Sequence, residues 1–142
     1  MRLQNSNGAT AVEFAIVLPI LLLLVLGIVE FSFLLYNKAV MTNACREGAR
    51  RGIVQRPPEI GRVQHSEIET EVNKYCFNHL ITFGGPTTPT VASTAPCPIG
   101  AYSGTDLKVT VTFHYTYLAL PDFIAGLIGG TDLKAEAVMK CE

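Results

Sequence analysis

The chain has 142 residues, with 11 basic and 12 acidic side chains, a formal charge of −1 at pH 7 and no tryptophan. This balance gives no net electrostatic field that would favour nucleic acid as a partner, and the length allows one modest domain beside a membrane segment. Apolar residues gather in the first quarter of the chain, which indicates a protein with one membrane anchor.

The uncharged stretch 14–29, "FAIVLPILLLLVLGIV", predicts a membrane-spanning helix. Its 16 residues cover about 24 Å, which is less than the roughly 30 Å hydrocarbon core of a bilayer. To span, the helix must extend back through Glu13 or forward past Glu30, and either extension brings a carboxylate to a membrane boundary. No small-residue cleavage site follows Val29, so we expect the helix to remain in the mature protein.

Good helix formers continue beyond the apolar stretch up to Pro57, so we expect one helix over about 9–54. Ala44, Gly48 and Gly52 recur at every fourth position and form a smooth ridge that suits close approach of another helix, and we assign them to subunit assembly.

The distribution of cationic residues bears on the orientation of the helix in the membrane. More Lys and Arg residues follow the apolar stretch than precede it, which would place the C-terminal part in the cytoplasm.

Two arginines near the end of this helix follow an acidic residue at helical spacing. Glu47 precedes Arg50 by three positions and Arg51 by four, which favours ion pairs within the helix. The alternative is that the arginines contact neighbouring subunits.

A second helix is expected from Ser66, where "SEIE" matches a capping box of Ser66 with Glu69. One face of it would carry its larger apolar and aromatic side chains, namely Ile68, Val72, Tyr75, Cys76, His79 and Leu80. The following stretch 82–105 is rich in Gly, Pro, Ser and Thr and predicts a loop.

Two strands are expected in the last third of the chain. Stretch 107–117 alternates between apolar and polar residues, and stretch 131–141 places every second side chain on an apolar face. Two antiparallel strands packed on helices predict an α+β head with a small β-hairpin or sheet.

All four cysteines follow the apolar stretch, and an even number on one side of a membrane suits an oxidising compartment. Four cysteines allow three pairings. We expect Cys76–Cys97 across a short loop and Cys45–Cys141 as the remaining pair. The alternative is four unpaired thiols, with Cys45 and Cys141 as buried apolar residues.

We find no catalytic motif and predict a structural protein without catalytic residues or cofactor. Cys76 and His79 spell C-x-x-H, but no second pair has the spacing of a zinc site, so no metal is expected. We interpret His65 and His114 as surface residues.

The position of Glu13 makes sense if the chain is cut after Gly8. Ala9 would then carry the new amino terminus, and Glu13 would be the fifth residue of the mature chain. In an assembly of parallel, staggered helices, the amine of one subunit can meet the carboxylate of a neighbour, so that neither charge remains unpaired in lipid.

The stretch 8–54, with Gly8 before "ATAVEF", a proline in the first apolar turns and "REGAR" at 46–50, resembles the TadE-like family of pseudopilins and minor pilins of the Tad (Flp-type) pilus system. The resemblance implies cleavage after Gly8 by a prepilin peptidase, with Glu13 and Phe14 in the Glu-Phe position of the processing site. It also implies a cytoplasmic N-terminus and an extracytoplasmic head, against the count of positive charges.

The resemblance gives a prepilin-type leader at 1–8, a transmembrane helix at 9–36, a continuation of that helix as a stalk at 37–56 and the head at 57–142. The implied location is the bacterial inner membrane. The implied partners are the prepilin peptidase, other Tad pilins or pseudopilins and inner-membrane platform proteins. The alternative is a single-pass envelope protein whose head binds a ligand or stabilises a membrane complex without entering a filament.

Overall fold

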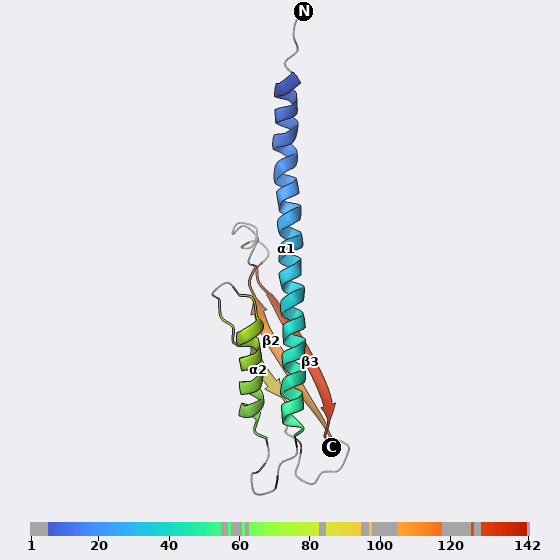
Figure 1. Ribbon diagram of the computed structural model, residues 1–142, viewed down its shortest axis with the longest axis vertical. Helices are drawn as coiled ribbons and strands as arrows, with labels where there is room; N and C mark the ends of the chain where they lie inside the picture. Colours follow the sequence, from blue (N-terminus) through green and yellow to red (C-terminus); the bar gives the residue numbers. More distant parts are fainter. Residues whose placement is uncertain are drawn as a thin grey trace, which may run out of the picture.

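The computed structural model describes residues 6–54, 57, 61, 63–82, 85–94, 97, 105–117, 126 and 129–141. The element order is α1 (Ser6–Gly52), α2 (His65–His79), β1 (Thr90–Ser93), β2 (Asp106–Tyr115) and β3 (Thr131–Lys140). The α+β prediction is therefore confirmed. Figure 1 shows α1 as one long helix whose C-terminal half lies beside α2 and the sheet, while its N-terminal half extends away from them.

The strands form one antiparallel sheet in the order β1-β2-β3. β2 and β3 pair over their full length, from Asp106↔Lys140 to Tyr115↔Thr131. Their predicted alternation is confirmed, because every second side chain of β2 is buried: Leu107, Val109, Val111, Phe113 and Tyr115. These side chains contribute to a core with buried residues of α1 and α2.

The prediction of a loop over 82–105 is wrong at β1. Thr90–Ser93 pairs with β2, and Val91, which lies opposite Val111, is buried. Four residues among Thr, Pro and Ser are too few to give a periodic pattern, so pairing with β2 creates this strand and local sequence does not.

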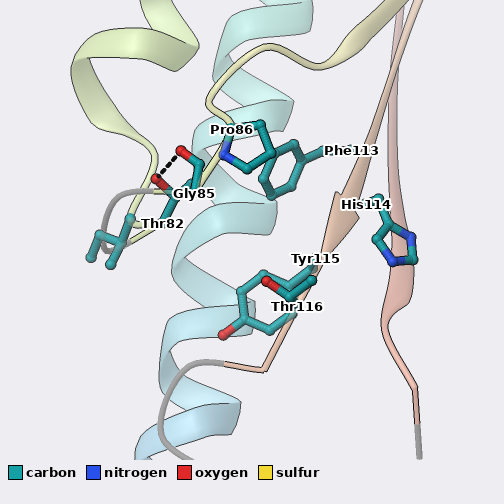
Figure 2. Close-up of a pocket in the computed structure, with 8 residues that line it drawn as sticks. Thr82, Gly85, Pro86, Phe113, His114, Tyr115 and Thr116 are labelled. Atoms are coloured by element: carbon teal, nitrogen blue, oxygen red, sulfur yellow. Dashed lines mark hydrogen bonds between the residues drawn. The ribbon is translucent and has the colours of Figure 1, made fainter. Parts of the chain in front are cut away.

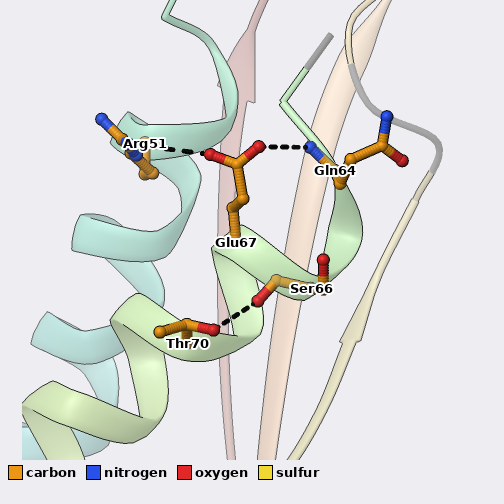
Figure 3. A network of polar contacts seen from close by, with 5 residues as sticks. All are labelled: Arg51, Gln64, Ser66, Glu67 and Thr70. Atoms are coloured by element: carbon orange, nitrogen blue, oxygen red, sulfur yellow. Dashed lines mark hydrogen bonds and ion pairs between the residues drawn. The ribbon is translucent and has the colours of Figure 1, made fainter.

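The second helix begins one residue earlier than predicted and has a different cap. The backbone N–H of Gln64 donates to the carboxylate of Glu67 at 3.3 Å, and Arg51 lies 3.7 Å from the same carboxylate group (Figure 3). Ser66 already lies within α2, where its carbonyl accepts from the Thr70 hydroxyl. Glu67 therefore ties the start of α2 to the end of α1. The predicted buried face is present at Ile68, Val72 and Cys76.

Candidate functional site

The residues predicted for processing lie on the uncovered N-terminal part of α1. Gly8, Ala9, Glu13 and Phe14 are all exposed, and Phe14 keeps 63% of its surface accessible. Ala9 and Glu13 are one helical turn apart. The helix thus presents this group away from the head, where another molecule can reach it (Figure 1).

The apolar surface of α1 is uncovered over a length that matches a bilayer. Every residue in 8–29 is exposed or only partly buried. These 22 residues span about 33 Å, close to the roughly 30 Å of a hydrocarbon core. The chain thus has a helix long and apolar enough to cross a membrane. So large an exposed apolar surface is otherwise rare on a protein in water.

The uncovered stretch ends at Glu30, which is only 4% exposed. The Tyr115 hydroxyl, at the end of β2, donates a hydrogen bond of 2.5 Å to Glu30 Oε1. Burial, followed by the bond to Glu30, raises the pKa of Tyr115. The phenol therefore stays protonated and remains the donor at neutral pH. This bond joins the end of the uncovered apolar part of α1 directly to the head.

A second polar contact fixes the head two turns further along α1. The fully buried Asn37 donates from Nδ2 to the Ile81 carbonyl at 2.9 Å, and its Oδ1 accepts from the Ile81 N–H at 3.0 Å. The segment after α2 is thereby held against α1 through both backbone hydrogen-bonding groups of one residue, Ile81. Sequence reasoning missed both Glu30–Tyr115 and Asn37–Ile81, and only the interruption of apolar sequence by Glu30 hinted at the first.

The ridge of small residues packs inside this chain. Ala44, Gly48 and Gly52 are buried. A Cβ on Gly48 would lie 2.5 Å from Cγ2 of Val72, and one on Gly52 would lie 2.3 Å from Cδ2 of Leu107. The ridge therefore allows α2 and β2 to approach α1, and the assignment of these three residues to subunit contacts is corrected, since the chain's own head covers them.

The arginines that follow the ridge make ion pairs with residues of this chain. Arg50 lies 3.3 Å from Glu47 within α1, as the spacing predicted. Arg51 instead pairs with Glu67 of α2 (Figure 3).

The predicted disulfide pairings are wrong. Cys97 and Cys141 form the bond, with a Cα–Cα distance of 5.6 Å, while Cys45 and Cys76 are free and buried. Cys141 directly follows β3 and its N–H bonds to the Thr105 carbonyl, so it lies at the end of the sheet and not beside α1. The bridge therefore joins the C-terminal end of β3 to the segment that follows β1.

The free thiols should be unreactive in the folded protein. Burial raises the pKa of Cys45 to about 11 and that of Cys76 to about 11, and the neighbouring Cys45 adds to the rise at Cys76. Since the thiolate is the reactive form, we expect no labelling of the native protein at pH 8. Denaturation without reductant should release two thiols per chain, and reduction should release four. Mass spectrometry counts the labels, and two labels on the native protein would contradict this packing.

The histidines do not converge on a metal-binding group. His79 is exposed and its Nδ1 lies 2.9 Å from the Tyr75 carbonyl oxygen, whereas Cys76 points into the core. His114 pairs with Asp132 at 2.7 Å on the exposed side of the sheet. Within the part of the chain that the structure describes, no three His, Cys, Asp or Glu side chains gather as metal ligands would.

Comparison with known families gives a match for most of α1. Residues 8–50 match the family described as TadE-like protein, a range that runs from Gly8 almost to the end of α1. Comparisons with curated proteins and with solved structures found no match. The match leaves α2 and the sheet outside it. It confirms the family predicted from the sequence: the α1 segment of this chain is TadE-like, which relates the protein to the Tad pilus system.

Proposed function

We propose that this protein is a membrane-anchored pseudopilin or minor pilin that contributes to assembly of a Tad pilus or to secretion by the Tad system. The observation that carries the proposal is the position of the TadE-like match on α1, whose N-terminal part is apolar and uncovered. A helix of this kind can sit in a membrane and later pack among the helices of other pilins. The role is structural and needs no catalytic residue.

The processing residues fit this role. Cleavage after Gly8 by a prepilin peptidase would make Ala9 the first residue of the mature chain, with Glu13 one turn away on the exposed helix. The Glu13 carboxylate would then pair with the terminal amine of a neighbouring subunit. In lipid each charge alone is costly, so the pair favours association over separation.

We further propose that the N-terminus is cytoplasmic and the head extracytoplasmic, in the bacterial inner membrane. The Cys97–Cys141 bridge supports this orientation, because disulfides persist in oxidising compartments. The cationic residues after the anchor are a weaker argument against it, since they lie on the part of α1 that packs against the head, and Arg50 and Arg51 are paired with acidic residues.

The proposal predicts a mature chain that starts at Ala9. Protein extracted from membranes of cells that contain the Tad prepilin peptidase should have the intact mass of residues 9–142, because the peptidase cuts after Gly8. A Gly8→Leu variant should keep the mass of the uncut chain.

An unprocessed Met1 terminus in those cells would contradict the proposal. It would favour the alternative, a single-pass envelope protein whose head binds a ligand or stabilises a membrane complex outside any filament.

A further inference from the structure

The head begins where the membrane-spanning stretch of α1 ends. Residues 8–29 already account for about 33 Å of helix, so a bilayer that covers them reaches to Glu30. Glu30 is bonded to Tyr115 of the head. No spacer of bare helix therefore separates the hydrocarbon boundary from the folded head.

The depth of other head residues follows from their contacts with α1. Tyr115 lies at the level of Glu30. Ile81 is held by Asn37, which lies seven residues, or about 10 Å, further along the helix. A headgroup layer occupies about 5–8 Å on each side of a bilayer. The end of β2 thus falls within the headgroup layer, and Ile81 lies just beyond it.

The side chains at this end of the head suit a membrane interface. Tyr115 and Tyr117 pack edge to face with ring centroids 6.1 Å apart, and Tyr36 projects from α1 about 9 Å beyond Glu30. Tyr117 is partly exposed at this end of the head, whereas Tyr115 is buried behind it and Tyr36 lies further from the bilayer along α1. Tyrosine concentrates at membrane interfaces because its ring is apolar and its hydroxyl is polar.

A pocket opens beside these tyrosines, with a cavity volume of about 100 Å³. Its lining comes from β2 and the residue after it, with Phe113, Tyr115 and Thr116, and from the segment after α2, with Thr82 and Pro86 (Figure 2). Its lining combines apolar surface with hydroxyl groups. The headgroup layer offers complementary chemistry, because the carboxyl ends of the acyl chains meet glycerol and phosphate oxygens there.

We propose that this end of the head is a lipid-contacting surface, formed by the exposed or partly exposed Thr82, Pro86, Thr116 and Tyr117, and that Thr116 and Tyr117 lie in the headgroup layer of the bilayer that α1 spans. The partner of this protein surface is the phospholipid bilayer itself. The protein surface is continuous with the apolar surface of α1. The Glu30–Tyr115 bond holds the head at this depth. The inference depends on α1 spanning a membrane and not on a role in a pilus.

The absence of tryptophan allows a direct measurement of depth with single-tryptophan variants. Thr116→Trp is the first choice, because Thr116 is exposed and its replacement removes no packing. Tyr117→Trp is the second. Each full-length variant is placed in nanodiscs of plain phosphatidylcholine or of phosphatidylcholine brominated near the start of its acyl chains. Emission from both variants should fall by about half or more in the brominated lipid, as expected for interfacial rings.

Two controls bracket the result. Leu22→Trp, on the uncovered apolar stretch, should be quenched strongly. Val54→Trp, beyond the far end of α1 and over 30 Å from Glu30, should keep its emission. If emission at 116 and 117 is unaffected while that at 22 is quenched, the head stands clear of the bilayer and the proposal fails.

The unmodified protein provides a second readout. Its tyrosine emission should fall in brominated lipid, since Tyr117 and the adjoining Tyr115 lie at this end of the head. Unchanged tyrosine emission would also overturn the proposal.

Discussion

Tyr115→Phe should lower the free energy of unfolding of the head by about 1–3 kcal/mol, because it removes the hydroxyl that donates to the buried carboxylate of Glu30. A carboxylate so well shielded from water cannot replace that donor with solvent without opening the contact between α1 and β2. The measurement is urea unfolding of the full chain in detergent micelles, followed by near-ultraviolet circular dichroism.

A double-mutant cycle isolates the contribution of the bond. Glu30→Leu alone should also destabilise the head, because it leaves the Tyr115 hydroxyl buried without its acceptor. Tyr115→Phe combined with Glu30→Leu should recover part of the loss, since both polar partners are then gone. Strict additivity of the two single effects would mean that the hydrogen bond does not stabilise the head.

Gly48→Val should destabilise the head by about 1–3 kcal/mol, a typical cost of overpacking a filled core. The new Cβ would fall 2.5 Å from Cγ2 of Val72 and 3.3 Å from Cγ2 of Ile68, and both neighbours are fully buried. Their β-branched side chains have few alternative rotamers. α2 would have to move away from α1, and the same urea unfolding measurement detects the loss.

Gly27→Val is the matched control. Gly27 lies on the same helix, but nothing approaches within 4 Å of the position a Cβ would take. Its unfolding midpoint should stay at that of the unmodified protein. If Gly48→Val unfolds at the same urea concentration as Gly27→Val, the ridge does not set the distance between α1 and α2.

Periodic sequence patterns predicted the elements that are long and have one buried face. β2 was recognisable because five alternate side chains face the core, and the buried face of α2 because Ile68, Val72 and Cys76 recur every fourth residue. Such patterns depend only on neighbours along the chain. β1 has no comparable pattern, because four residues paired to one edge of β2 acquire their structure from that partner.

The contacts that place the head could not be predicted in the same way. Glu30 and Tyr115 are 85 positions apart, and neither belongs to a pattern that names the other. The cysteine pairing failed for a related reason. Loop length favoured Cys76–Cys97, but the sheet brings Cys141 to Cys97 and the helix packing buries Cys76. The tertiary structure therefore determines which cysteines form the disulfide.

The two carboxylates of the apolar region have different environments. Glu30 is buried and bonded to the head, whereas Glu13 is exposed on bare helix about 25 Å away. The charge of a glutamate alone could define the membrane boundary at either end of the apolar stretch. Their contrast indicates that Glu30 acts within the chain, and it leaves Glu13 available to another molecule.

Association of the Glu13→Ala variant with other pilins tests the account most directly. In bacteria with the Tad system, the variant should insert and be cleaved normally. Its co-purification with the other Tad pilins from solubilised membranes should fall by at least about tenfold, which corresponds to 1.4 kcal/mol. Glu47→Ala, which removes a carboxylate paired with Arg50 on the same helix, should co-purify normally. Undiminished co-purification of Glu13→Ala would contradict a role for this carboxylate in holding pilin subunits together.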